Sequence, residues 1–196
     1  MAKIIVIEGP DKVGKETQSR LLQTNLSNAG YRTLRVEVPS KACPRTHRLI
    51  YKMLGNGWAK RTPNFFQFVQ FLNKFLFQHR VLPALDEFYD VIIFDRWRLS
   101  AIIYGNATGV NERLNRFLYR RLRKADITLV FHGRSFRRNS VDDAYEKDSE
   151  LQARVKKDYV SWAYGHSQDH VLINNEGTLQ EVQDAVQAEL ALREVL

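Results

Sequence analysis

The residues that most clearly suit a chemical role lie near the N-terminus. They form a loop bounded by two glycines and followed by a lysine. Gly9 and Gly14 come after the apolar run at residues 4–7, and Lys15 directly follows the second glycine. Glycines let the backbone turn its N–H groups inward, and the start of a helix carries about half a positive charge. A lysine in this place reaches the terminal phosphates of a nucleotide. The spacing therefore predicts a phosphate-binding loop over residues 9–17.

Glu16 departs from the usual form of such a loop. The position after the lysine normally holds Ser or Thr, whose hydroxyl helps to hold Mg²⁺. Here the hydroxyl comes one residue later, at Thr17. Three interpretations are open: the Glu16 carboxylate binds the metal directly, it points to solvent while water and another acid hold the metal, or it repels phosphates and lowers activity.

A second polar cluster begins where the apolar run at residues 91–94 ends. Asp95 and Arg96 stand at the end of this run, and ligands of an open parallel sheet bind at the carboxyl ends of its strands. A carboxylate there can hold Mg²⁺ through water, and an arginine can fork two phosphate oxygens. The alternative is a salt bridge between the two residues that only closes the strand.

Five apolar runs of strand length alternate with longer helix-like stretches. The runs occupy residues 4–7, 33–38, 91–94, 127–131 and 171–173. Because they are continuously apolar, they predict a parallel sheet covered by helices on both faces. The chain has neither an internal repeat nor a long Pro, Gly or Ser linker, so we expect one three-layer α/β domain over residues 1–196.

Two segments predict particular helices. Residues 64–82 carry so many phenylalanines that one helix face cannot hold them all, so this helix should pack on the sheet and also contact a ligand or a second subunit. Thr178 and Glu181 have the spacing of a capping box, which predicts a packing helix over residues 178–195.

The composition excludes several classes of protein. No apolar run approaches the roughly 18 residues of a membrane helix, and the single cysteine, Cys43, leaves no intramolecular disulfide. The N-terminus lacks a secretory leader pattern, so we expect a cytoplasmic protein. The net charge of +8 attracts anions, and the placement of basic residues after strand-like runs favours a phosphate pocket over a nucleic-acid partner.

Four segments in this order resemble the thymidylate kinase family. They read E-G-P-D-K-V-G-K-E-T-Q at residues 8–18, D-R-W-R-L-S-A-I-I-Y-G at 95–105, A-D-I-T-L-V-F at 125–131 and A-Y-E-K-D-S-E-L-Q-A-R-V at 144–155. The resemblance implies a P-loop kinase fold with a five-stranded parallel sheet and a mobile lid over about residues 132–147. It also implies an enzyme, usually a homodimer, that uses Mg²⁺ and transfers the γ-phosphoryl group of ATP to a deoxynucleoside monophosphate.

The resemblance implies roles for individual residues. Those expected to act in catalysis are Asp11, Lys12, Lys15, Asp95 and Arg96. Those expected to bind ATP are Gly9, Gly14, Lys15, Glu16, Thr17 and the lid residues Arg134, Arg137 and Arg138. Those expected to bind the acceptor nucleotide are Asp11, Lys41, Phe71, Lys74, Arg96, Ser100, Tyr104, Tyr145 and Glu146. Asp95 and Glu16 are the expected metal ligands.

Base recognition departs most from the family pattern. Counting back from Asp95 without gaps places Phe71 where the family stacks an aromatic ring on the base, but Phe75 then stands where an arginine commonly reads a thymine oxygen. A shift of one residue instead brings Asn73 and Lys74 into register. Thymine, a modified pyrimidine or several bases are therefore all compatible with the sequence.

Two other functions stay open at this point. A deoxynucleoside kinase shares the loop and lid but needs a carboxylate base, for which Glu37 is a candidate. A nucleotide-binding protein with weakened catalysis would explain Glu16. The compact length and the departures from the pattern also suit a viral or phage member, whose location would be the host cytoplasm.

Overall fold

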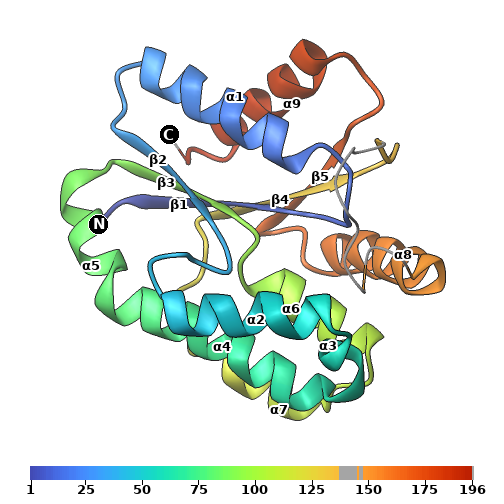
Figure 1. Ribbon diagram of the computed structural model, residues 1–196. Coiled ribbons are helices and arrows are strands. Elements are labelled where there is room, and N and C mark those ends of the chain that lie inside the picture. Colours follow the sequence, from blue (N-terminus) through green and yellow to red (C-terminus); the bar gives the residue numbers. More distant parts are fainter. Residues whose placement is uncertain (137–144, 146–147, 196) are drawn as a thin grey trace.

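Five parallel strands form the centre of the molecule (Figure 1). A computed structural model describes residues 1–136, 145 and 148–195. The strands are β1 (Lys3–Glu8), β2 (Thr33–Glu37), β3 (Val91–Asp95), β4 (Ile127–His132) and β5 (His170–Asn174), in the order β2-β3-β1-β4-β5. All the predicted strands are confirmed, as is the parallel sheet.

Helices cover both faces of the sheet, which gives three layers (Figure 1). On one face lie α1 (Lys15–Asn28) and α9 (Leu179–Leu192). The other face is covered by α2 (Pro44–Gly55), α3 (Trp58–Arg61), α4 (Pro63–Arg80), α5 (Leu82–Phe88), α6 (Arg98–Ala107), α7 (Glu112–Tyr119) and α8 (Ser149–Gly165). No helix among the described residues is long and apolar enough to cross a membrane.

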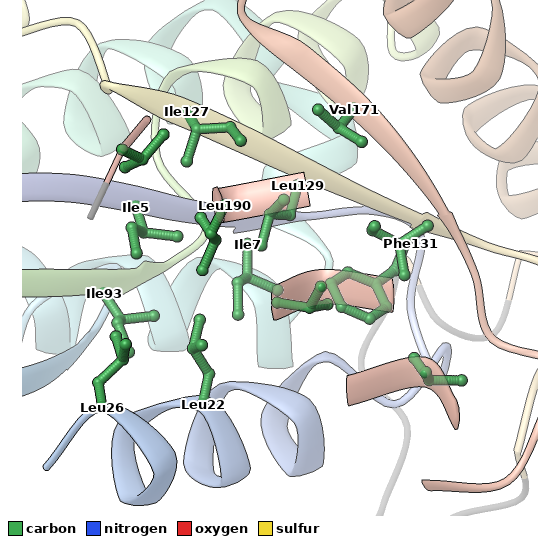
Figure 2. Packing of buried hydrophobic residues seen from close by; sticks show 14 of the residues in the cluster. Ile5, Ile7, Leu22, Leu26, Ile93, Ile127, Leu129, Phe131, Val171 and Leu190 are labelled. Carbon is green, nitrogen blue, oxygen red and sulfur yellow. The ribbon is translucent and has the colours of Figure 1, made fainter. Parts of the chain in front are cut away.

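The strands alternate their side chains between the two helical layers. Ile5 and Ile7 of β1 join Leu22 of α1 in a fully buried cluster that also includes residues of α9 (Figure 2). Ile4 of β1 faces the opposite layer, where it packs in the cluster that contains Phe77 of α4. This alternation follows from the period of two in a strand, and burial on both faces explains why the strands read as uninterrupted apolar runs.

The predicted start of the C-terminal helix is confirmed, although the helix ends at Leu192 and not at residue 195. The Thr178 hydroxyl accepts a hydrogen bond from the Glu181 amide at 3.2 Å, and the Glu181 carboxylate accepts one from the Thr178 amide at 2.7 Å. This capping box starts α9 one residue after Thr178. The reciprocal bonds satisfy two amides that a helix start otherwise leaves unpaired.

The strand order brings the two polar clusters of the sequence together. β1 pairs with β3 so that Ile7 lies beside Asp95. The connection from β1 leads to β2 on one side, and β4 lies on the other side of β1. The carboxyl end of β1 is therefore a topological switch point, the place where such sheets bind ligands.

Close packing between α6 and α7 allows no side chain at Gly105. A β-carbon there would overlap the amide nitrogen of Asn115, which is fully buried and donates to the Ala101 carbonyl of α6 at 3.1 Å. We predict that Gly105→Ala lowers the free energy of unfolding by about 1–3 kcal/mol, because overpacking outweighs the better helix propensity of alanine. Urea denaturation measures this change.

Gly55 is the matched control for this substitution. It lies at the end of α2, and a β-carbon added there would meet no atom within 4 Å. Gly55→Ala should leave the stability unchanged or raise it by up to about 1 kcal/mol. Equal effects of the two substitutions would contradict the packing argument.

Candidate functional site

The predicted phosphate loop connects β1 to α1 and opens onto a cavity. Gly9 and Gly14 both have positive φ angles, of 138° and 81°. A β-carbon on Gly9 would press against the Phe131 carbonyl oxygen of β4, so only glycine fits there. Gly14 precedes the first turn of α1, which points its unpaired amides toward the cavity. The loop therefore has the form that an anion-binding site requires.

The cavity has a volume of about 650 Å³ and extends across the carboxyl ends of the strands. Most of the site residues expected from the sequence line it. These are Asp11, Lys12, Gly14, Lys15, Glu16, Thr17, Lys74, Asp95, Arg96, Ser100, Tyr104 and Tyr145. Residues separated by up to 134 positions thus meet in one site.

Lys15 is buried at the base of the loop. Its ammonium donates a hydrogen bond to the carbonyl oxygen of Pro10 within the loop. Burial lowers the pKa of Lys15 to about 7, and the nearby Arg96 lowers it as well, against the opposing effects of Asp11 and Asp95. Without a bound anion, about half of the Lys15 side chains would therefore be protonated near pH 7.

Asp11 and Arg96 form the central ion pair of the cavity. The Arg96 guanidinium donates to one oxygen of Asp11, while the Tyr104 hydroxyl at 2.5 Å and the Gln152 amide at 2.9 Å donate to the other. Burial alone raises the pKa of Asp11, but Arg96, Lys15 and the two hydrogen bonds lower it below its usual value. Asp11 is thus held ionised, and it keeps Arg96 at the centre of the site.

A buried glutamate holds the turn that carries Arg96. Glu8, at the end of β1, is fully buried and accepts hydrogen bonds from the amides of Trp97 at 2.8 Å and Ser100 at 3.1 Å. It also accepts bonds from the Ser100 hydroxyl and, at 3.1 Å, from the Tyr159 hydroxyl. Arg96 itself has a φ of 70°, a strained conformation for arginine. Glu8 therefore fixes the first turn of α6 so that Arg96 faces the cavity.

Asp95 and Glu16, the expected metal ligands, both have arginine partners. Arg35 of β2 donates to Asp95 at 2.8 Å and to the Ser19 hydroxyl at 2.6 Å. Glu16 forms an ion pair with Arg20 one helical turn further on, at 3.0 Å. No group of three or more His, Cys, Asp or Glu side chains that could hold a metal occurs among the residues that the structure describes.

The α4 end of the cavity is lined by one aromatic and several polar side chains. Phe66, Gln67, Gln70 and Lys74 all face the cavity from α4. Lys74 is almost fully buried, donates to Gln70 at 3.2 Å and lies 5.7 Å from the centre of the Tyr119 ring. Burial lowers the pKa of Lys74 to about 8. The one-residue shift considered above, which brings Lys74 into register, thus agrees with its position in the site.

The expectation that Phe71 stacks on a ligand is wrong for this structure. Phe71 does not line the cavity: it packs edge-on against Tyr119, at 5.8 Å, and its ring is tilted against Phe75, at 5.4 Å. Gln67, Gln70 and Lys74 share the cavity face of the helix, and Phe71 lies just beyond the edge of that face. Phe66 is the aromatic residue of α4 that lines the cavity.

Lys41 also lies outside the cavity, contrary to the expectation. Asn73 of α4 binds the backbone on both sides of Ser40, accepting from its amide at 2.7 Å and donating to its carbonyl at 3.1 Å. This bidentate contact fixes the turn, and Lys41 is exposed. Glu37, Val38 and Pro39 line the cavity in its place, so Asn73 is occupied with the turn and not with a ligand.

At the opposite end, Asn175 ties the loop to the segment after β4. Its amide donates to the carbonyls of Val13 at 3.0 Å and Arg134 at 2.6 Å, and its oxygen accepts from the Arg134 amide at 2.7 Å. Asn175 lines the cavity together with Phe136 and with Gly177, Thr178, Leu179 and Val182. The Arg134 side chain is exposed and lies 5.9 Å from the Phe136 ring, outside the cavity lining.

Three expected residues cannot be placed. Arg137, Arg138 and Glu146 lie outside the described residues, as does most of the expected lid over residues 132–147. Tyr145 is described: it lines the cavity with its ring stacked at 6.0 Å on Tyr104, and its hydroxyl donates to the Ala59 carbonyl at 3.3 Å.

Several residues of the site had no role assigned from the sequence. Glu8, Gln152 and Tyr159 act through hydrogen bonds between segments up to 151 positions apart, and no local pattern signals such bonds. Arg35 sits in the apolar run of β2, where a charged residue is unusual and is itself a usable signal. Gln70, by contrast, is one of the polar residues of this Phe-rich segment, with Asn73, Lys74 and Gln78, that the sequence offers as readers of a base edge.

The comparisons with known proteins agree with this architecture. The family model described as thymidylate kinase matches residues 7–186. The "Probable thymidylate kinase" of Thermococcus gammatolerans is 27% identical over 83% of this chain and 84% of its own length. The structure is similar to the thymidylate kinases of Candida albicans (TM-score 0.78, 21% identity, 99% of this chain and 93% of that one) and Ehrlichia chaffeensis (TM-score 0.72, 22% identity, 97% and 98%). With the family match extending over nearly the whole chain, and a phosphate loop, Asp11 and Arg96 gathered in one cavity, the chain belongs to the thymidylate kinase family of ATP-dependent nucleoside monophosphate kinases.

Proposed function

We propose that this enzyme transfers the γ-phosphoryl group of ATP to a deoxypyrimidine monophosphate whose base carries a carbonyl at position 4, such as dTMP or a 5-substituted dUMP. The observation that carries the proposal is the convergence of Lys15, Asp11 and Arg96 in the middle of one cavity, with Asn175 toward one end and Lys74 toward the other. ATP would occupy the Asn175 end, and the acceptor nucleotide the Lys74 end.

The reaction would depend on charge and alignment. Transfer between two phosphates needs no strong general base, because the attacking oxygen already carries negative charge. Lys15 and Lys12 would hold the ATP phosphates, and Arg96 would hold the acceptor phosphate in line with them. Held in place by Asp11, Arg96 is preorganised, so little reorganisation is needed when charge develops on the transferring group.

The α4 end supports recognition of a carbonyl oxygen because its polar groups are mainly donors. The Gln70 amide oxygen already accepts from Lys74, and the Gln67 amide oxygen accepts from the Tyr119 hydroxyl at 3.2 Å. From α4, the two NH₂ groups and the Lys74 ammonium are then the groups offered to a base. Donors match the 4-carbonyl of thymine or uracil and oppose the 4-amino group of cytosine. Tyr145 beside Tyr104 would disfavour a 2′-hydroxyl on the sugar.

The side chains present fit Mg²⁺ delivered with ATP. This ion keeps several waters and binds through one or two carboxylates plus substrate phosphates, so it needs no dedicated cluster of protein ligands. Asp95 would hold it, with Glu16 and the Thr17 hydroxyl lining the same part of the cavity. When bound, the ion would neutralise phosphate charge, and Arg35 would keep Asp95 oriented.

The proposal predicts a selective acceptor profile. In a coupled assay of ADP formation, dTMP and dUMP should be turned over with a higher kcat/KM than dCMP, and thymidine should not be turned over. Lys74→Met should raise the KM for dTMP by about tenfold or more, because a charged hydrogen bond is lost. Lys52→Met, on the exposed surface of α2, is the matched control and should change nothing.

Other outcomes of this assay would reject the proposal. Turnover of thymidine would instead favour a nucleoside kinase that uses Glu37, which lines the cavity. ATP binding without turnover of any acceptor would favour a nucleotide-binding protein. A preference for dCMP would disprove the interpretation of the α4 end as rich in donors.

The lowered pKa of Lys15 predicts proton uptake when ADP binds. Because its pKa is about 7, the Lys15 side chain of the unliganded protein is mostly neutral at about pH 8. Bound phosphates favour its charged form. Calorimetry at that pH, in buffers of different ionisation enthalpy, should therefore show uptake of nearly one proton. Lys15→Met should abolish the uptake and Lys52→Met should preserve it; equal uptake in both variants would contradict the assignment.

We also propose that the chain forms a homodimer through the outer face of α4. Phe65 and Phe68 are about half exposed on this helix, and Leu114 is similarly exposed on the neighbouring α7. A second copy would bury these side chains, as expected for a helix with too many phenylalanines for one face.

Sedimentation analysis tests the dimer. Phe68→Asp should shift the protein from dimer to monomer, because a buried, unpaired carboxylate opposes association. Phe88→Asp, at an exposed position of α5, is the matched control and should leave the dimer intact. A monomeric wild-type protein, or a dimer unaffected by Phe68→Asp, would contradict this interface.

A further inference from the structure

A second cavity lies on the other side of α6, enclosed by α6, α7, α8 and the sheet. Its volume is about 610 Å³, within the range of small-molecule sites. None of its lining residues also lines the first cavity. Its floor includes Val6 and Thr128 of the sheet, and its walls include Arg98 of α6 and Trp162 of α8. The second cavity is therefore separate from the first.

The wall and rim of this second cavity carry an excess of positive charge. Arg98, Arg113, Arg120 and Lys124 line it, and among the described residues none of the four has a carboxylate within ion-pair distance. The acids that line the cavity are engaged elsewhere. Asp169 contacts His170 at 2.7 Å, and Glu8 is bound by the first turn of α6. Asp169 also offsets part of the Arg98 charge, but among the described residues Arg113, Arg120 and Lys124 have no carboxylate within ion-pair distance, so the cavity keeps a net positive charge.

Two buried donors in this cavity lack acceptors within the described part of the chain. They are the Nε of Arg98 and the indole Nε1 of Trp162. The Trp162 ring is fixed between His166, stacked at 4.2 Å, and Arg116, 5.3 Å away. Burial lowers the pKa of Arg98 by more than the nearby Asp169 raises it. A buried donor without an acceptor is destabilising, so a ligand that brings acceptor oxygens to this place would be favoured.

From these contacts we infer that the second cavity binds a small polyanion that carries a diphosphate group, either inorganic or part of a nucleotide. A guanidinium group can donate hydrogen bonds to two phosphate oxygens at once. Several cations that face one cavity also favour a ligand with several negative charges over a single carboxylate. The cations line a concave space of small-molecule size that is about half open to solvent and has two buried donors in its wall. This arrangement favours a small molecule over nucleic acid.

Calorimetric titration with inorganic pyrophosphate tests this site. The experiment uses the full chain carrying Lys15→Ala, which removes the main contact of the phosphate loop, so that binding lost on substitution of Arg113 and Arg120 reports on the second cavity. We expect one site per chain, and we expect Arg113→Gln with Arg120→Gln to weaken it by about tenfold or more. Both arginines are exposed, so the double substitution should leave the fold unchanged.

The matched control is Arg61→Gln with Arg80→Gln, which removes the same charge from exposed positions outside both cavities. Binding should change by less than about twofold in this control. Equal weakening in the two double variants, or no binding in the Lys15→Ala protein, would overturn the inference.

Two further arms identify the ligand. ADP binding more tightly than pyrophosphate, with the same dependence on Arg113 and Arg120, would assign the site to a nucleotide; weaker binding would assign it to an inorganic anion. A DNA duplex that binds more tightly than either, with strong salt dependence and loss in the same variants, would overturn the inference in favour of nucleic acid. Kinase turnover of the Arg113 and Arg120 variant separates this test from the proposed function, because neither residue touches the first cavity.

Discussion

The hydrogen bonds that Glu8 accepts are the interaction on which the site depends. A charged carboxylate buried at the end of a central strand is strongly unfavourable unless it is fully satisfied, and here two backbone amides and two hydroxyls satisfy it. Both amides belong to the turn after β3 and the first turn of α6, so the need to solvate one charge joins two neighbouring strands at their carboxyl ends. That junction holds Arg96 in a backbone conformation that arginine does not otherwise favour. The orientation of the central cation therefore follows from the burial of an anion that does not itself line the cavity.

The charged side chains of the first cavity are each bound to a partner within the protein. Arg96 is bound to Asp11, Lys15 to the Pro10 carbonyl, and Asp95 to Arg35. Each charge is thereby held in place at a distance set by the strands. A preorganised arrangement of this kind gives up little conformational entropy when substrate binds, and its dipoles already have the direction that the reaction requires.

Much of the fold and the centre of the site could be predicted from the sequence, whereas the periphery could not. The strands and the phosphate loop have local signatures, because continuous apolar runs and the spacing of Gly9, Gly14 and Lys15 each have a direct physical cause. The α4 end has no such signature. The chain has eleven phenylalanines that could be assigned to stack on a base, and a shift of the register by one residue places an amide where a ring is expected. Counting from Asp95 without a gap selected Phe71, although helical geometry puts Gln70 and Lys74 on the cavity face. The prediction that Lys41 lines the site did not hold for a different reason. The turn that leaves Lys41 exposed is fixed by Asn73, more than thirty positions away.

The burial of Lys15, whose ammonium donates to the Pro10 carbonyl, has a consequence for what can enter the loop. The Lys15 ammonium has three donors and can keep this bond while it binds an anion, but the anion must supply enough negative charge to keep a buried lysine protonated. A chloride or acetate ion offers one charge and few acceptor atoms, whereas a polyphosphate chain offers several of both. The burial of Lys15 thus favours polyphosphates over small monovalent anions in the loop.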